Sequence, residues 1–257
     1  MKSKRLAVIL IAVAFSLVVL ISCVGLFSVK KVHVDFTVSQ NASSERIQEK
    51  LDRFVGKNLL FFNVDSVEQA LDDEPYIQVL SVEKRYPNVL DVRLKERVEV
   101  YSINYDGKTF VLDDNGVVLA EKDCEEQRDI IELSIGEGVA VQGLTLGKVV
   151  KTDNPTLLST VFDMAKSVNL ADCIKGIEIE KVDGYANEFD VVFKSFSGVE
   201  ICVEDALTNG KEKVANAFKV YDEYLTDYQK TYGSIQSYMQ HDGKFEVTYE
   251  QKVIDIN

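Results

Sequence analysis

The chain has 257 residues, which is long enough for two modest domains with separate hydrophobic cores. It holds 42 acidic and 29 basic residues, and its formal net charge is −13 at pH 7. This acidity argues against nucleic acid as a partner, because phosphate backbones are bound by clustered lysine and arginine. It also argues against a body that lies flat on anionic lipid.

The N-terminal end predicts a membrane span. Residues 6–27 form a stretch of 22 positions without a charge, and as a helix this stretch would be about 33 Å long, enough to cross the hydrocarbon core of a bilayer. Three basic side chains precede it and two lysines follow it closely. The positive-inside bias then favours a short cytoplasmic tail at 1–5, a single transmembrane helix at 6–27 and a C-terminal body outside the cytoplasm.

Two other interpretations of this stretch stay open. A cleaved signal peptide would have an apolar region of about 7–15 residues and a small-residue cleavage site, whereas this stretch is longer and lacks a clear A-x-A motif. The sequence LISC, which ends at Cys23, is typical of a lipoprotein signal in which Cys23 would carry the lipid. The chain stays apolar beyond Cys23, which favours the anchor. An exported lipoprotein, or a sensor-type module that binds a small ligand, is therefore the alternative.

Residues 28–97 predict a small β-α-α-β-β module. Ser43 or Ser44 is the expected N-cap of the first helix, and Asp65 with Glu68 has the spacing of a capping box for the second. The expected elements are a strand at 29–37, helices within 43–56 and 65–75, and strands at 76–86 and 89–96.

The end of this module lies inside a long alternating run. Residues 89–101 alternate apolar and charged side chains, as a half-buried strand does, but the run is longer than a usual strand and Glu96 stands in its apolar register. A buried carboxylate without a partner would cost several kcal/mol, whereas a charge at a domain boundary stays in contact with water. We therefore expect two strands with the domain boundary at Glu96-Arg97.

Residues 98–257 predict a larger mixed domain that is rich in strands and has two helices. The turn at Asp106-Gly107 separates two strands of a hairpin series, and Asn154-Pro155 begins a helix that continues to about residue 168. The further expected elements are strands at 98–105, 108–113, 117–121, 174–182, 188–195 and 198–204, a long helix within 209–233, and a final hairpin of 234–240 and 244–250. The fold class is thus α+β, with the β-rich domain following the membrane helix and the small module.

The sequence offers no set of residues suited to catalysis. The two histidines, His33 and His241, are far apart in the chain, and no G-x-S-x-G, H-E-x-x-H, P-loop or G-x-G-x-x-G motif is present. The cysteines, which have neither C-x-x-C nor metal-like spacing, are Cys23, Cys124, Cys173 and Cys202. We expect no enzyme, no cofactor and no metal site.

The final hairpin is the candidate interaction site. Edge strands can accept a strand from a partner through backbone hydrogen bonds. In the last strand Phe245, Val247 and Tyr249 share one face, and few residues follow to cover it. The same pattern fits a strand interior to its sheet, so both placements stay open.

In this order of elements the chain resembles the FtsQ/DivIB family of bacterial cell division proteins, and the small module is similar to a POTRA domain. The stretches that carry the likeness are VKKVHVDF, ERIQEKLDRFVGKNLLFFNVD, EPYIQVLSVEKRYPNVLDVRLKERVEV and VLDDNGVVL. Glu96-Arg97 matches the Glu-Arg that closes this module in the family. The second half departs in detail, since its stretch IIELSIGEGVAVQG lacks a proline that is frequent there.

The resemblance implies a non-enzymatic scaffold of the divisome, held in the cell membrane and enriched at the septum. Its implied partners are FtsL-like and FtsB/DivIC-like single-span proteins, with the septal peptidoglycan synthase as a further candidate. Carried over by position, the partner segment would bind at the terminal hairpin. The implied partner-binding residues are Ile235, Tyr238, Phe245, Val247 and Tyr249.

Overall fold

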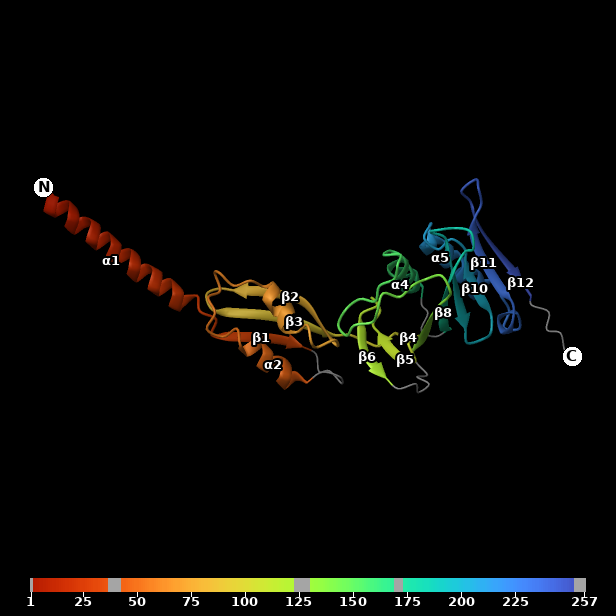
Figure 1. The fold of residues 1–257 in the computed structure, drawn as a ribbon, viewed down its shortest axis with the longest axis horizontal. Coiled ribbons are helices and arrows are strands. Elements are labelled where there is room, and N and C mark those ends of the chain that lie inside the picture. The colour runs from red at the N-terminus through yellow and green to blue at the C-terminus, as the bar shows by residue number, and fades with distance from the viewer. Residues whose placement is uncertain (1, 37–42, 123–129, 169–172, 252–257) are drawn as a thin grey trace. The chain divides into compact units, whose positions relative to one another are not determined.

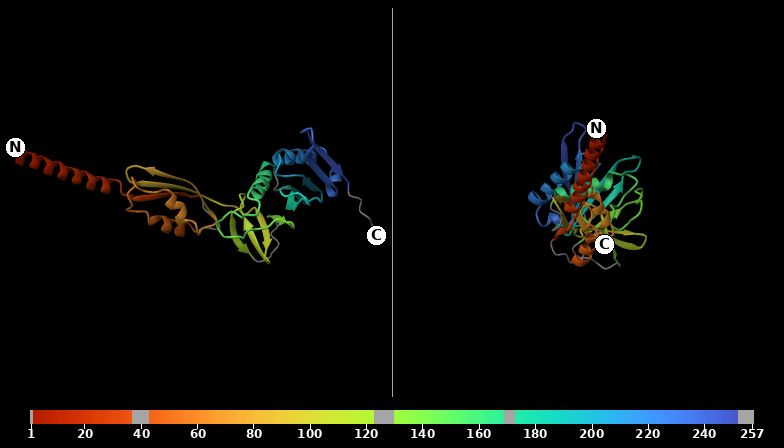
Figure 2. Two further views of the ribbon diagram at one scale, coloured as in Figure 1. Left: turned by 45° about the horizontal axis from the view of Figure 1, so that its top comes forward. Right: turned by 90° about the vertical axis from the view of Figure 1, so that its left-hand side faces the viewer.

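The structure is a computed structural model that describes residues 2–36, 43–122, 130–168 and 173–251. The chain divides into two compact units, Met1–Arg97 and Val98–Asn257, which are taken one at a time. Figure 1 and the turned views of Figure 2 show the two units and their elements. They contain both helices and strands, and the second unit is mostly strands, which agrees with the α+β class.

The first unit begins with helix α1, Lys2–Leu26. Within the residues that the structure describes, no helix has the length and the mean hydropathy required of a candidate membrane span. Large apolar side chains of α1 are nevertheless exposed, among them Ile11, Phe15 and Val18.

After α1 the first unit forms a three-stranded sheet with two helices. The elements are β1 (Lys31–Phe36), α2 (Ser44–Asp52), α3 (Asp65–Ala70), β2 (Ile77–Arg85) and β3 (Val89–Glu96). The sheet order is β1-β3-β2, with β1 parallel and β2 antiparallel to β3. A parallel pair needs a crossover connection, and α2 and α3 lie in the connection from β1 to β2 that makes it possible. The β-α-α-β-β order predicted from the sequence is therefore confirmed.

Apolar side chains from both helices and all three strands make the core of this unit. Ile47 and Leu51 of α2 and Val67 of α3 are buried together with Leu90 and Val92 of β3. On the other parity of β3, Asp91 is also buried, where it pairs with His33 at 2.7 Å and Arg85 at 2.5 Å. The ion pair with Arg85 and the contact with the His33 ring compensate the buried carboxylate, which would otherwise be costly.

One helix cap in this unit differs from the prediction. Ser43 caps α2, since its side chain accepts a hydrogen bond from the backbone N–H of Arg46. The prediction of a capping box at Asp65 and Glu68 is wrong. Asp65 is already the first residue of α3, and its N–H donates to the side chain of Asn63. The side-chain cap lies earlier than predicted, because the Asn63 side chain accepts the N–H of Asp65, which is one of the unpaired N–H groups at the start of the helix.

The second unit is built on a nine-stranded sheet. Its strands are β4 (Tyr101–Tyr105), β5 (Lys108–Leu112), β6 (Val118–Lys122), β7 (Ile131–Ile135), β8 (Ile174–Lys181), β9 (Phe189–Ser195), β10 (Glu200–Val203), β11 (Ser234–Met239) and β12 (Phe245–Glu250). The order across the sheet is β12-β11-β10-β9-β8-β7-β4-β5-β6. The long run at 89–101 is thus divided, with β3 ending at Glu96 and β4 beginning at Tyr101.

Two α-helices, α4 (Leu157–Ser167) and α5 (Gly210–Glu223), pack against each other and supply core side chains to this sheet. Their buried residues include Phe162 of α4 and Val214 and Phe218 of α5, and the Phe218 ring meets Phe193 of β9 edge to face at 5.8 Å. The predicted helix over 209–233 is too long. The apolar pattern continues to Tyr228, but that side chain is exposed, and residues 229–231 form a separate 3-10 turn, η1.

Candidate functional site

The terminal hairpin lies at one end of the nine-stranded sheet. Strand β12 pairs antiparallel with β11, and in the described part of the chain no other strand pairs with it. Strand β11 in turn pairs parallel with β10, a pairing made possible by the crossover through α5. The sequence left open whether the last strand is an edge strand or an interior strand, and in the described part of the chain it is an edge strand.

The hydrogen-bond pattern shows which residues present their backbone at this edge. The N–H of Gln240 donates to the carbonyl oxygen of Lys244 at 2.8 Å, so these two residues form a hydrogen-bonded pair of the ladder. Hydrogen-bonded and non-hydrogen-bonded pairs alternate along an antiparallel ladder. Because Phe245, Val247 and Tyr249 are in non-hydrogen-bonded pairs with β11, their N–H and C=O groups point away from it, to the open side.

The side chains named for this site have unequal exposure. Ile235 of β11 is fully buried, and Val247 and Tyr249 are partly buried against the core of the sheet. Phe245 is exposed at 40%, and Tyr238 lies between these extremes. Ile235, Val247 and Tyr249 therefore hold the hairpin in place, whereas Phe245 offers its side chain to solvent.

Two contacts fix β12 to the rest of the unit. The Tyr249 hydroxyl lies 3.0 Å from the carbonyl oxygen of Tyr232 and 3.2 Å from that of Gln229, both in the loop after α5. Gly233 has φ of +129°, and a Cβ there would lie 2.8 Å from the carbonyl oxygen of Glu250 and from the Tyr249 ring. Only glycine allows the loop and the edge strand to approach so closely.

A buried lysine fixes the neighbouring strands to α5. Lys213 is 2% exposed, and its ammonium donates to the backbone carbonyl oxygens of Glu204 at 2.6 Å and Asp205 at 3.0 Å. The buried Ser237 hydroxyl of β11 donates to the Lys213 carbonyl oxygen at 2.9 Å. Burial lowers the pKa of Lys213 below its ordinary value, and nearby carboxylates only partly offset this. Lys213 therefore has a structural role, because its ammonium group and its carbonyl oxygen both form hydrogen bonds inside the protein.

Two partly buried carboxylates near Lys213 have raised pKa values. Burial raises the pKa of Asp190 and of Glu204, and the repulsion between the two carboxylates adds to the rise in Glu204. Burial likewise raises the pKa of Cys202 to about 12. Such a thiol is poorly suited to nucleophilic or metal chemistry, because the thiolate is the reactive form. Among the described residues, no group of three or more His, Cys, Asp or Glu side chains could hold a metal ion.

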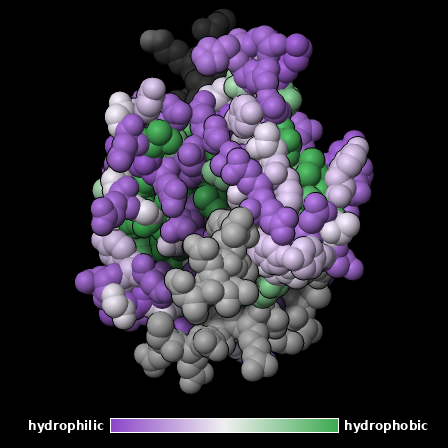
Figure 3. Space-filling view, turned by 90° about the vertical axis from the view of Figure 1, so that its right-hand side faces the viewer, coloured by the Kyte–Doolittle hydropathy of each residue, from purple (hydrophilic) through white to green (hydrophobic). Residues whose placement is uncertain are grey.

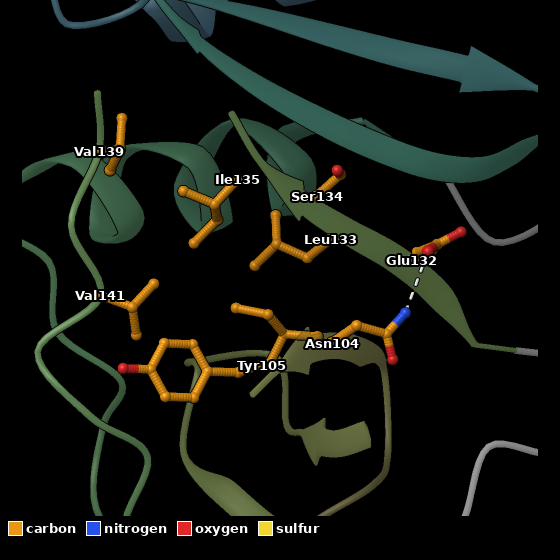
Figure 4. Close-up of a pocket in the computed structure, with 9 residues that line it drawn as sticks. Asn104, Tyr105, Glu132, Leu133, Ser134, Ile135, Val139 and Val141 are labelled. Carbon is orange, nitrogen blue, oxygen red and sulfur yellow. Dashed lines mark hydrogen bonds between the residues drawn. The ribbon is translucent and has the colours of Figure 1, made fainter. Parts of the chain in front are cut away.

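A small cavity lies beside the sheet, where β4 and β7 separate. Their ladder has only two pairs, Tyr101 with Ile131 and Ser102 with Glu132. Beyond these pairs the strands frame a cavity of about 270 Å³, in which the Asn104 amide donates to the Glu132 carboxylate at 3.4 Å (Figure 4). The remaining lining side chains in Figure 4, apart from Tyr105 and Ser134, are aliphatic. The volume is below the range of about 300–1,000 Å³ usual for ligand pockets, so the cavity gives little support to a small-molecule site.

Figure 3 views the molecule from the side where β11 and β12 lie. The described residues that are visible in this view are mostly hydrophilic, with small separate apolar areas between them.

Comparison with known proteins first defines the class of the small module. Residues 27–97 match the family model described as POTRA domain, FtsQ-type, and this match spans the β-α-α-β-β unit. The first unit therefore contains a POTRA domain of the FtsQ type.

Relatives then extend the comparison to the rest of the chain. Cell division protein DivIB of Clostridium acetobutylicum is 26% identical over 191 residues, which cover 74% of this chain and 73% of the relative. DivIB of Clostridium tetani is 29% identical over 34% of this chain and 36% of the relative, and cell division protein FtsQ of Myxococcus fulvus is 31% identical over 32% and 29%. The resemblance to the FtsQ/DivIB family is thus confirmed, and the relatives' names support a role related to cell division.

A solved structure, the major extracytoplasmic domain of DivIB from Geobacillus stearothermophilus, aligns with 51% of this chain and 98% of that chain at 11% identity. Its TM-score of 0.31 is too low for the likeness to bear on the fold described above.

Proposed function

We propose that this chain is a membrane-anchored, non-enzymatic scaffold of the cell division machinery. In this proposal it binds FtsL-like and FtsB/DivIC-like single-span proteins at the septum and links them to septal peptidoglycan synthesis, with the synthase as a further partner. The observation that carries the proposal is the position of β12 at the end of the sheet, with the backbone groups of Phe245, Val247 and Tyr249 directed outward. An extended partner segment can pair with such an edge.

The anchor rests on the sequence and on α1. The uncharged stretch at residues 6–27 coincides closely with α1, and the apolar side chains that α1 exposes would be costly in water. A helix of this kind, preceded by basic residues, is suited to a single-pass anchor with its N-terminus in the cytoplasm.

The binding mode can be tested by two substitutions at one position. Val247→Pro removes the outward N–H and places a ring at the edge, while Val247→Ala keeps the N–H and shortens only the side chain. For the full chain in detergent with a purified single-span partner, we expect Val247→Pro to weaken binding by at least about tenfold, because a lost hydrogen bond costs about 1 kcal/mol and the ring clash adds to it. Val247→Ala should bind within about threefold of the unchanged chain, since the N–H is retained.

Thermal unfolding of both variants serves as the control for folding. Equal binding by the proline variant and the unchanged chain would rule out strand addition at β12. An equal loss in the two variants would show that the partner reads the side chain and not the backbone.

A further inference from the structure

Three segments of the first unit meet beside the C-terminal end of α1. The N–H of Leu59 donates to the Phe27 carbonyl oxygen at 2.7 Å, and the Asn58 amide reaches the Val24 carbonyl oxygen in the last turn of α1 at 3.5 Å. The N–H of Lys30 donates to the Asn88 carbonyl oxygen at 2.9 Å. The segments 27–31, 53–62 and 84–88 together are called the helix-proximal tip.

The tip exposes large apolar and aromatic side chains. Phe61 is exposed at 85% and Leu60 at 42%, although Leu59 and Phe62 on either side of them are buried. Tyr86 is exposed at 57%, and its ring meets Phe27 edge to face at 5.9 Å. Tyrosine, which has an apolar ring and a polar hydroxyl, is enriched where a protein meets the membrane–water interface.

The tip also differs from the rest of the chain in charge. It contains no acidic residue, whereas the whole chain has 42 acidic against 29 basic residues. The acidic composition argued against contact between the whole body and anionic lipid, but the basic residues are locally concentrated at this one end. The tip has six basic residues. Arg85 already pairs with the buried Asp91, and the other five are Lys30, Lys31, Arg53, Lys57 and Lys84.

We propose that the helix-proximal tip rests in the membrane interface, with Leu60 and Phe61 inserted at the acyl boundary and the basic side chains against anionic lipid headgroups. The proposal rests on the proposed anchor, because Asn58 contacts the last turn of α1 and would lie at the membrane surface only if α1 spans the bilayer. Apolar burial and attraction to anionic lipid are the two contributions that hold interfacial segments on membranes. The contact would limit how the POTRA domain tilts over the bilayer.

The absence of tryptophan from the chain allows a clean test. Single-tryptophan variants of the full chain are placed in vesicles whose lipids carry bromine on the acyl chains, which quenches nearby indole fluorescence. Phe61→Trp reports on the tip and Phe15→Trp on α1. Phe196→Trp, at a site 58% exposed in the second unit, is the matched control.

With phosphatidylglycerol in the vesicles, we expect quenched, blue-shifted emission from Phe61→Trp and Phe15→Trp, and unquenched emission from Phe196→Trp. Vesicles of phosphatidylcholine alone should quench Phe61→Trp less. Because no other protein is present, quenching at position 61 cannot come from a protein partner.

The remaining outcomes separate this inference from the proposed anchor. Quenching of Phe15→Trp without Phe61→Trp overturns the inference, leaves the anchor intact and points to a protein as the occupant of the tip. No quenching of either variant overturns the anchor and the inference with it. Equal quenching of Phe61→Trp in both lipid compositions overturns the role of the basic residues.

Discussion

The ring of Tyr249 lies so close to Gly233 that a Cβ on the glycine would be 2.8 Å from ring carbon Cε2. This contact joins the edge strand β12 to the loop that follows α5. It makes the open edge of the sheet depend on a single glycine outside the strand.

Gly233→Ala should therefore displace β12 and weaken partner binding. We expect a loss of about 1–3 kcal/mol in the free energy of unfolding, because the new methyl group meets both the ring and the Glu250 carbonyl oxygen at a positive φ. Chemical denaturation measures the loss. Gly243→Ala is the control, since Gly243 also has positive φ but has no atom within 4 Å of its Cβ position. Equal losses in the two variants would contradict the importance of the Tyr249 contact.

The cap of α3 provides a second prediction. Asn63→Ala should lower the free energy of unfolding by about 1 kcal/mol, because its side chain accepts the hydrogen bond of the Asp65 N–H. Asp65→Ala should cost only a few tenths, about 0.3 kcal/mol, through its position in the first turn. Urea unfolding measures the free energy of unfolding of both variants. A larger loss of stability for Asp65→Ala than for Asn63→Ala would show that Asp65 caps the helix, as the sequence suggested.

A third prediction concerns the pH dependence of stability that the partly buried Asp190 carboxyl group causes. The pKa of Asp190 is raised in the folded protein, chiefly by burial. The folded state therefore binds the proton of the Asp190 carboxyl group more tightly than the unfolded state does. The stabilisation from the protonated carboxyl group is present below the usual pKa of 3.8 and is lost as the pH rises through the raised pKa of the folded state. Asp190→Asn should raise the melting temperature at pH 7, and the difference should shrink as the pH falls towards 3.8. A difference independent of pH would show that the carboxyl charge is not its cause.

A fourth prediction concerns Cys202. Burial raises the pKa of this thiol to about 12, so at pH 8 it should react with iodoacetamide far more slowly in the folded protein than in urea. Mass spectrometry of the labelled peptides gives both rates. Comparable rates in the two states would show that β10 opens readily or that the thiol is not confined.

Local sequence patterns predicted most of the elements but not their limits. The apolar stripe through Val214, Phe218 and Tyr221 indicated α5, yet the same spacing continues to Tyr228, which lies beyond the end of the helix and packs against Tyr232 at 5.0 Å. Periodicity shows which side chains share a face, but a helix end depends on local hydrogen bonds that the pattern does not contain.

The edge position of β12 could not be derived from its own alternation. Phe245, Val247 and Tyr249 would alternate in the same way in an interior strand. Their place follows from the parallel pairing of β11 with β10, which brings together segments more than thirty residues apart. The helix-proximal tip could not be derived from the sequence for a similar reason, because its basic and aromatic residues come from three separate segments of the chain.

Photo-crosslinking in dividing cells tests the central claim most directly. A photoreactive phenylalanine analogue replaces Phe245 on the edge strand, and the same analogue at the exposed Lys108 of β5 is the control. We expect an adduct between position 245 and a small single-span membrane protein, and no such adduct from position 108. An absence of adducts at position 245 in cells with normal levels of the protein, or the same adduct from both positions, would contradict the assignment of β12 as the docking edge.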